Sequence, residues 1–280
     1  MAPGVPARRG GLSDQDGALN PTLDPAQLAL LAAAGLTAGA VNAVAGGGSL
    51  VSFPALLAVG YPALTANVTN SVALTPGYFG GTVGYRRELS GQRGRVLTLG
   101  AVSAAGAVLG AFLLLVSSQA FFERVVPFLI FLACGLLAVQ TPLARLVREY
   151  REGRPGGSAG ADRHTVPLLA AQFLAAAYGA YFGAGVGIMM LAILGIFLAD
   201  TLQRLNALKG LLSLLVSVIA AIAFALLAEV GWVAVAVMAV ASLLGGQLGV
   251  VLARRLDDRT LRWLVIAFGV AVGVRLLVAG

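Results

Sequence analysis

Charged side chains are scarce in this sequence. Only 11% of its 280 residues are charged, against about 25% in a soluble globular domain, and 59% are hydrophobic. The mean hydropathy is +0.90. Apolar runs of about 18 residues or more recur along the chain, and this length crosses roughly 30 Å of hydrocarbon. The composition therefore predicts an all-α protein, a polytopic bundle of transmembrane helices.

Residues that bind metals or carry out acid–base chemistry are also scarce. The chain has one cysteine, Cys134, and one histidine, His164, which are too few for a metal site. Its 12 acidic residues all lie in loops, in the N-terminal segment or at the ends of apolar runs. No buried proton relay, catalytic carboxylate or Walker motif is indicated. We expect no catalytic residues, no metal and no cofactor, and we do not expect an enzyme.

Positive charge exceeds negative charge. The formal net charge is +7, and nearly all of the positive charge comes from arginines that occur singly or in pairs between apolar runs. This arrangement is typical of the cytoplasmic loops of membrane proteins. A nucleic-acid-binding domain would instead gather its basic residues on one soluble face. We expect the lipid bilayer as a partner and no nucleic acid.

We expect the chain to divide into a polar, disordered tail (1–24), a first transmembrane repeat (25–142), a polar cytoplasmic linker (143–165) and a second transmembrane repeat (166–280). Asp24 followed by Pro25 is a typical helix start, because the acid can cap the helix and proline suits its first position. We predict apolar segments at about 25–45, 49–59, 63–86, 95–117, 122–142, 166–183, 187–198, 201–227, 231–253 and 259–279. Two of them, 49–59 and 187–198, are short, so eight to ten segments enter the membrane, depending on whether the short ones span or re-enter.

The two halves carry related patterns. With Asn67 aligned on Asn206, an offset of 139 residues (206 − 67), several glycines and polar residues coincide. The coinciding pairs are Gly46/Gly185, Gly48/Gly187, Asn70/Lys209, Ser103/Ser242, Gly106/Gly245 and Gly110/Gly249. The order of segment lengths also matches, with a short second segment in each half. The sequence predicts two repeats of about five apolar segments each.

The arginines indicate how these repeats are related. The loop after the third segment holds Arg86, Arg87, Arg93 and Arg95, whereas the equivalent loop at 228–231 has no basic residue. The loop near 117–123 has almost none, whereas its equivalent holds Arg254, Arg255, Arg259 and Arg262. Because arginine gathers on the cytoplasmic side, equivalent loops are expected on opposite sides of the membrane. The repeats are therefore predicted to be inverted, with both termini facing outward and the linker facing the cytoplasm.

Glycines that lie four residues apart recur within the apolar segments. This spacing lets helix backbones approach closely in a membrane. We predict close helix packing at Gly35/Gly39, Gly80/Gly84, Gly106/Gly110, Gly179/Gly183, Gly245/Gly249 and Gly269/Gly273.

Each repeat contains a glycine-rich interruption after its first segment. The first comprises Gly46, Gly47 and Gly48, followed by Ser49, and the second comprises Gly183, Gly185 and Gly187. A helix that starts after such a break has a partial positive charge and free N–H groups at its N-terminus, which favour an anion. The alternative is that the glycines only permit a tight hairpin between two helices, and the two interpretations are compatible.

Polar residues follow each interruption at equivalent places. Asn67, Thr69 and Asn70 lie early in the third segment, and Asn206 and Lys209 occupy the matching turn of the eighth. Polar groups at this depth are costly unless they are paired or face water. Lys209 either faces a substrate anion or extends its ammonium group to the membrane edge as an anchor. The predicted substrate-binding residues are Gly46, Gly47, Gly48, Ser49, Asn67, Thr69, Asn70, Gly183, Gly185, Gly187, Asn206 and Lys209.

In these residues the chain resembles the sulfite exporter TauE/SafE family of membrane permeases. The resemblance is carried by the glycine-rich stretch Ala45–Asn70 and its echo Phe182–Gly210, with Trp232 and the segment Gly245–Gly249, and it covers about residues 27–279. It implies movement of sulfite, a sulfonate or a related organosulfur anion across the cytoplasmic, or inner, membrane of a bacterium.

These observations predict a multi-pass secondary transporter for a small anion, with its site at the interface of the inverted halves and alternating access by rocking of one half against the other. A passive anion channel on the same fold is the alternative. The sequence leaves the substrate, the direction of transport and the coupling ion open, with a proton as one candidate for that ion. It also leaves open whether the chain forms a homo-oligomer.

Overall fold

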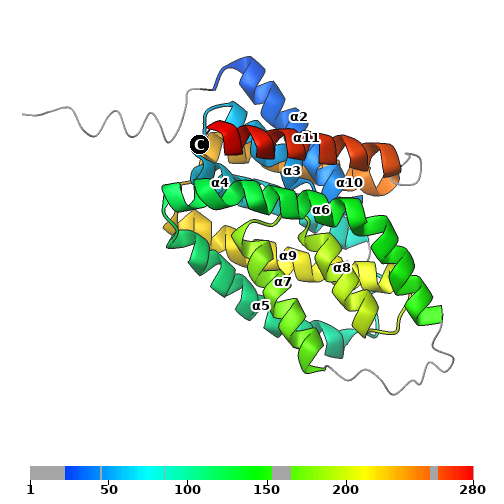
Figure 1. Ribbon diagram of the computed structural model, residues 1–280. Coiled ribbons are helices and arrows are strands. Elements are labelled where there is room, and N and C mark those ends of the chain that lie inside the picture. The colour runs from blue at the N-terminus through cyan, green and yellow to red at the C-terminus, as the bar shows by residue number, and fades with distance from the viewer. Residues whose placement is uncertain (1–22, 45, 85, 153–164, 253–257, 280) are drawn as a thin grey trace, which may run out of the picture.

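The computed structural model describes residues 23–44, 46–84, 86–152, 165–252 and 258–279. Within these ranges the chain forms ten helices and no strand, which confirms the all-α prediction (Figure 1). They are α2 (Pro25–Val44), α3 (Ser49–Ala58), α4 (Ala63–Gly84), α5 (Arg93–Leu115), α6 (Gln119–Glu152), α7 (Val166–Tyr181), α8 (Val186–Phe197), α9 (Leu202–Leu227), α10 (Trp232–Leu252) and α11 (Asp258–Ala279).

Helix α2, the first of the described helices, starts at the capping residue that the sequence indicates. The Asp24 carboxylate accepts a hydrogen bond from the N–H of Gln27 (2.7 Å), and the N–H of Asp24 donates to Oε1 of Gln27 (3.0 Å). This reciprocal pair satisfies donors that a helix start otherwise leaves free. Thr201 precedes α9 in a similar role, since its hydroxyl accepts the N–H of Arg204 (3.4 Å).

Helix α6 is longer than the sequence predicted. It continues to Glu152, whereas the apolar segment was expected to end at 142 and to be followed by a polar loop. Hydropathy marks where a segment stops being apolar, but a helix can continue beyond that point with a charged surface. Residues 1–22 of the predicted tail and 153–164 of the predicted linker lie outside the described residues.

The exterior of the bundle is apolar. Five helical stretches are long and apolar enough to cross a membrane, namely Pro25–Ala43, Arg93–Leu115, Gln119–Val139, Gln203–Leu227 and Trp232–Gly249. Large apolar side chains such as Leu97, Val108 and Val240 are exposed on the helix surfaces, as a lipid environment requires. Helix α4 is not among the five, because the polar residues Asn67 and Asn70, both buried, lower its hydropathy.

The closest helix packing joins α2 to α10 and α5 to α7, and glycines make it possible. A Cβ atom on Gly110 would collide with the carbonyl of Ala177, and one on Gly245 would collide with that of Leu36. The four-residue spacing of glycines predicted the close contacts of Gly110 and Gly245. It also predicted the close contacts that the structure shows at Gly35, Gly39, Gly106 and Gly249. On α11, an added Cβ on Gly269 would lie 2.7 Å from the sulfur of Cys134 on α6. Gly80, by contrast, has only ordinary van der Waals contacts.

Two pairs of helices, α2–α3 and α7–α8, are separated by short interruptions, and these interruptions touch each other. The N–H of Gly185 donates a hydrogen bond to the carbonyl of Gly46 (3.1 Å). The first interruption is further held by Asn42, whose carbonyl oxygen Oδ1 accepts the N–H of Gly48 (2.8 Å). The two glycine-rich breaks, far apart in sequence, therefore form one junction inside the bundle.

Packing of α5 against α7 gives a test of the fold. We expect Gly110→Leu to lower the thermal stability of the purified protein in detergent by about 1–3 kcal/mol or more, because the added side chain must displace the Ala177 backbone. Gly135→Leu on α6 is the matched control, since a Cβ there meets nothing within 4 Å. Equal melting temperatures for the two variants would contradict this packing.

Candidate functional site

The glycines at the junction adopt backbone conformations that other residues rarely take. Gly46, Gly183 and Gly185 have φ angles of +83°, +81° and +77°. This left-handed conformation costs L-residues free energy and lets the chain turn sharply between consecutive helices. The turns place the first residues of α3 and α8 next to the centre of the bundle, where two cavities lie.

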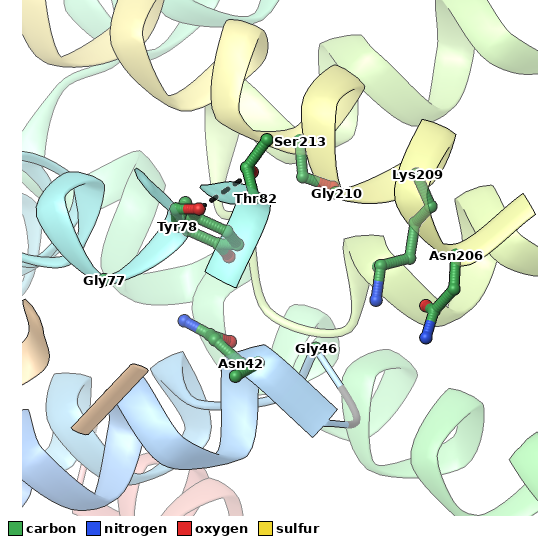
Figure 2. Close-up of a pocket in the computed structure, with 11 residues that line it drawn as sticks. Asn42, Gly46, Gly77, Tyr78, Thr82, Asn206, Lys209, Gly210 and Ser213 are labelled. Atoms are coloured by element: carbon green, nitrogen blue, oxygen red, sulfur yellow. Dashed lines mark hydrogen bonds between the residues drawn. The ribbon is translucent and has the colours of Figure 1, made fainter. Parts of the chain in front are cut away.

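The first cavity, here called the Lys209 cavity, lies between α2, α4, α8 and α9 (Figure 2). About 20 Å³ of it is open to the centre of a water molecule, which is room for about one water. Its lining consists of Asn42, Ala43, Gly46, Gly77, Tyr78, Thr82, Gly187, Asn206, Lys209, Gly210 and Ser213.

Lys209 is the only lysine in the chain, and it is buried at this cavity with 6% of its surface exposed. Its aliphatic stem passes over Gly187 at the start of α8, where an added Cβ would lie 3.7 Å from Cδ. Among the described residues, its ammonium group has no hydrogen-bond acceptor and no carboxylate partner. Within the described part of the chain, the cavity therefore contains a cation without a counter-charge.

Two asparagine amides border the same cavity with unused hydrogen-bonding atoms. The side-chain oxygen Oδ1 of Asn42 accepts a hydrogen bond from the N–H of Gly48, and the Nδ2 donor of Asn42 has no partner among the described residues. The Oδ1 atom of Asn206 is likewise buried and unpaired there. Buried polar groups are normally hydrogen-bonded, so these two atoms are available to a ligand or to water in the cavity.

The second cavity, here called the Asn70 cavity, lies between α3, α4, α7, α8 and α9. About 30 Å³ is open to the centre of a water molecule, and the lining comprises Ser49, Asn70, Ser71, Leu74, Tyr78, Gly179, Phe182, Gly183, Val186, Ser213, Val216, Ser217 and Ala220. Asn70 is 1% exposed, and its Oδ1 atom has no partner among the described residues. Unlike the Lys209 cavity, this one has no charged residue in its lining.

The residues predicted from the sequence are distributed over both cavities. Gly46, Gly187, Asn206 and Lys209 line the first. Ser49, Asn70 and Gly183 line the second.

The other predicted residues have structural partners. Asn67 donates its amide N–H to the carbonyl of Tyr181 (2.9 Å), and the hydroxyl of Thr69 accepts the N–H of Gly231 (3.0 Å). Gly47, Gly48 and Gly185 pack against Leu137, Ala38 and Ala133, respectively.

Asn42, Tyr78, Ser213 and Ser217 were not predicted from the sequence. A signal for the serines does exist, because Lys209, Ser213 and Ser217 are spaced four apart and so lie on one face of α9. Asn42 had no such signal, since it stands alone in an apolar helix.

An arginine-rich end of the bundle lies beside the start of α9. Asp200 accepts hydrogen bonds from Arg95 on α5 and from Nε of Arg204 (3.0 Å), while Arg204 also donates to the carbonyl of Ser90 (3.1 Å). Burial of the Asp200 carboxyl raises its pKa, but the hydrogen bonds from Arg204, the Thr201 N–H and Arg95 outweigh this effect. The pKa of Asp200 therefore lies below its usual value.

The model of the family described as sulfite exporter TauE/SafE matches residues 31–276, which include both cavities. The chain belongs to this family. Two relatives agree with the assignment. A "Probable membrane transporter protein" of Haemophilus influenzae is 29% identical over 222 residues, covering 79% of this chain and 83% of that protein. No solved structure matches the chain.

The second relative is the "Probable membrane transporter protein ORF9" of a Sinorhizobium species. It is 35% identical over 103 residues, which are 37% of this chain and 40% of that protein. With the apolar helices, these findings identify a TauE/SafE-type membrane transporter that crosses the membrane several times.

The Asp200 cluster of this TauE/SafE protein predicts a pH-dependent stability. Because folding lowers the pKa of Asp200, its ionised form stabilises the fold above its usual pKa, and this stabilisation is lost as the pH falls through the lowered value. We expect Asp200→Asn to cost about 1.5–3 kcal/mol at pH 7 in a detergent unfolding assay, which is typical of hydrogen bonds to charged groups.

The difference between Asp200→Asn and the wild type should shrink as the pH falls below about 4. Glu229→Gln, an exposed carboxylate in the loop before α10, serves as the control and should change little. A difference that stays constant across this pH range would contradict the assignment.

Proposed function

We propose that this protein is a secondary transporter that moves a small anion, such as sulfite, a sulfonate or a related organosulfur anion, across the cytoplasmic membrane of a bacterium. The observation that carries the proposal is the single lysine of the chain, which is buried beside the junction of two interrupted helices and has no partner among the described residues. The TauE/SafE family supports the sulfur-containing class of substrate.

The energetics favour an anionic ligand at Lys209. An ammonium group in the interior loses its hydration, which costs several kcal/mol unless a partner of opposite charge replaces the water. A pair of charges 4 Å apart gains about 4 kcal/mol at an effective dielectric constant of about 20. The free Nδ2 donor of Asn42 and the N-terminus of α8 at Gly187 would add hydrogen bonds and a partial positive charge.

The small size of the cavity restricts the ligand. Room for about one water suits the head of a small oxyanion only after some widening, so we expect the cavity to expand when the anion binds. Lysine suits a cavity of this size better than arginine, because its ammonium group is a compact charge on a flexible stem.

Inverted repeats would explain why two cavities exist. Six pairs of positions, each 139 residues apart, line one cavity each or their common wall: Ala43/Phe182, Asn70/Lys209, Ser71/Gly210, Leu74/Ser213, Gly77/Val216 and Tyr78/Ser217. The glycine contacts of α10 with α2 similarly correspond to those of α5 with α7. These correspondences support two repeats of opposite orientation, and we place the arginine-rich end of α4 and α9 in the cytoplasm.

The helix contacts suggest which parts move during alternating access. Glycine contacts join α2 to α10 and α5 to α7, so each close pair contains one helix from each half of the sequence. We therefore propose that the moving bodies are the groups α2–α4–α10 and α5–α7–α9 rather than the halves themselves. These groups meet at α4 and α9, where Thr75 and Ser217 share a hydrogen bond (2.9 Å) and where both cavities lie.

Transport is tested by counterflow in liposomes that contain the purified protein. Vesicles loaded with unlabelled methanesulfonate or sulfite should accumulate the labelled anion, because a carrier returns across the membrane with a substrate bound. Anion-selective current without counterflow would instead establish the passive channel. Absence of both would refute the proposed function for these anions.

Lys209 should determine anion affinity. We expect Lys209→Gln to weaken methanesulfonate binding at least about thirtyfold, since loss of one partner of a buried charge pair costs about 2 kcal/mol or more. Counterflow at low substrate should fall in parallel. Arg124→Gln, which removes an exposed cation from α6, is the control and should leave both unchanged.

Binding can be measured without transport, because Lys209 is the only lysine. Reductive methylation followed by peptide mass spectrometry separates this amine from the α-amino group. Methanesulfonate should slow methylation of Lys209 in the wild type. A methylation rate that is insensitive to every anion tested would contradict an anion site at this residue.

A further inference from the structure

The Lys209 cavity and the Asn70 cavity are neighbours that share a wall. Tyr78 and Ser213 line both of them, and no other residue does. In Figure 2 the labelled Tyr78 and Ser213 lie on the side of the view away from Lys209 and Asn206, and Thr82 lies beside Tyr78. Along α4 and α9 the Asn70 cavity lies further from the arginine-rich end, because Asn70 and Ala220 replace Thr82 and Asn206 in its lining.

The Asn70 cavity has the features of a polar site without charge. The Asn70 side chain is 1% exposed, and its buried Oδ1 atom, an acceptor, has no partner among the described residues. No hydrogen bond to the described part of the chain therefore holds the amide, and its Nδ2 carries the donors that an anion needs. An asparagine amide can present two N–H donors, and the hydroxyl of Ser49 stands at the start of α3, where the helix has a partial positive charge. Neutral donors of this kind can bind an oxyanion after it has moved away from the ammonium group of Lys209.

We propose that the Asn70 cavity is a second binding site for the same small oxyanion, uncharged and weaker than the Lys209 site, and that the Tyr78 side chain closes the passage between the two. This inference rests on the proposed transport function. Asn70 takes the position that Lys209 takes in the other repeat, so the substrate exchanges an ionic contact for an amide contact as it crosses.

A weaker second site serves transport because a bound anion must also be able to leave. A path with a lysine in each cavity would hold the anion at both ends, whereas release needs at least one site of modest affinity. Helix α4 has a suitable place for movement, since Pro76, two residues before Tyr78, removes one backbone donor from the helix. Rotation of the helix segment that bears Tyr78 would join the cavities.

Asn70→Leu tests the second site. We expect the concentration of methanesulfonate that protects Lys209 from methylation to stay near the wild-type value, while the maximal counterflow rate falls at least about tenfold, the effect of one lost hydrogen bond to a charged ligand. Asn70→Ser retains a hydroxyl donor and should lie closer to the wild type. The protection assay also shows that the variant is folded.

Other outcomes would overturn this inference. Unchanged counterflow in Asn70→Leu would remove the Asn70 cavity from the path. Loss of protection together with counterflow, in a variant that elutes as a folded protein, would place Asn70 in the Lys209 site. If Asn70→Leu does not fold, a comparison of Asn70→Ala with Asn70→Ser tests the inference instead, with the same two measurements: protection of Lys209 from methylation and the maximal counterflow rate. A wild type that neither binds nor transports would instead defeat the proposed function, and the inference with it.

Whether the Tyr78 side chain closes the passage between the two cavities is tested by thiol modification, without a transport assay. Cys134 is the only cysteine and is buried, so Cys134→Ala gives a background in which Asn70→Cys carries the single thiol. We expect an impermeant anionic methanethiosulfonate reagent, added from the arginine-rich side, to modify this thiol at least about tenfold faster after Tyr78→Ala than after Tyr78→Phe. Equal rates in these two variants would refute the role of Tyr78.

Discussion

The structure depends on one requirement of lipid, which is that every backbone polar group must find a partner within the protein. A helix interrupted inside the membrane violates this requirement unless something replaces the missing bonds. Here one hydrogen bond joins the two interruptions, from the N–H of Gly185 to the carbonyl of Gly46, and Asn42 supports the first by accepting the N–H of Gly48. The site is therefore a consequence of how the broken helices are stabilised.

Side-chain charge is used sparingly around this junction. The chain places arginine at its loops and helix ends, and its one lysine inside. Nearby amides differ in how many of their polar atoms hold the helices together. Asn67 donates to the carbonyl of Tyr181 while its Oδ1 atom stays unpaired, and Asn70, one helical turn later, forms no side-chain hydrogen bond, both among the described residues. The difference between these two asparagines is thus a difference in what each amide contacts.

This distinction explains how far the sequence alone could lead. Hydropathy located the helices within a few residues, because the length and polarity of each segment are local properties, and it missed only the charged continuation of α6 to Glu152. Glycine spacing marked positions such as Gly110 and Gly245 as places of close helix packing, but it did not give the partner helices. The sequence could not divide the polar residues between two cavities, because that division depends on the tertiary neighbours of each side chain. Thr69, for example, is bound by the N–H of Gly231, which comes from a distant loop.

The pairing of α2 with α10 also has a consequence for biosynthesis. Helices enter the bilayer in the order in which they are translated, and side-by-side association follows insertion. The glycine surface of α2 is among the first to be made, but its partner α10 is the last but one of the described helices to emerge. During most of translation α2 therefore has only lipid or temporary neighbours against that surface. The nascent chain must keep this glycine surface of α2 without its final partner until α10 has emerged.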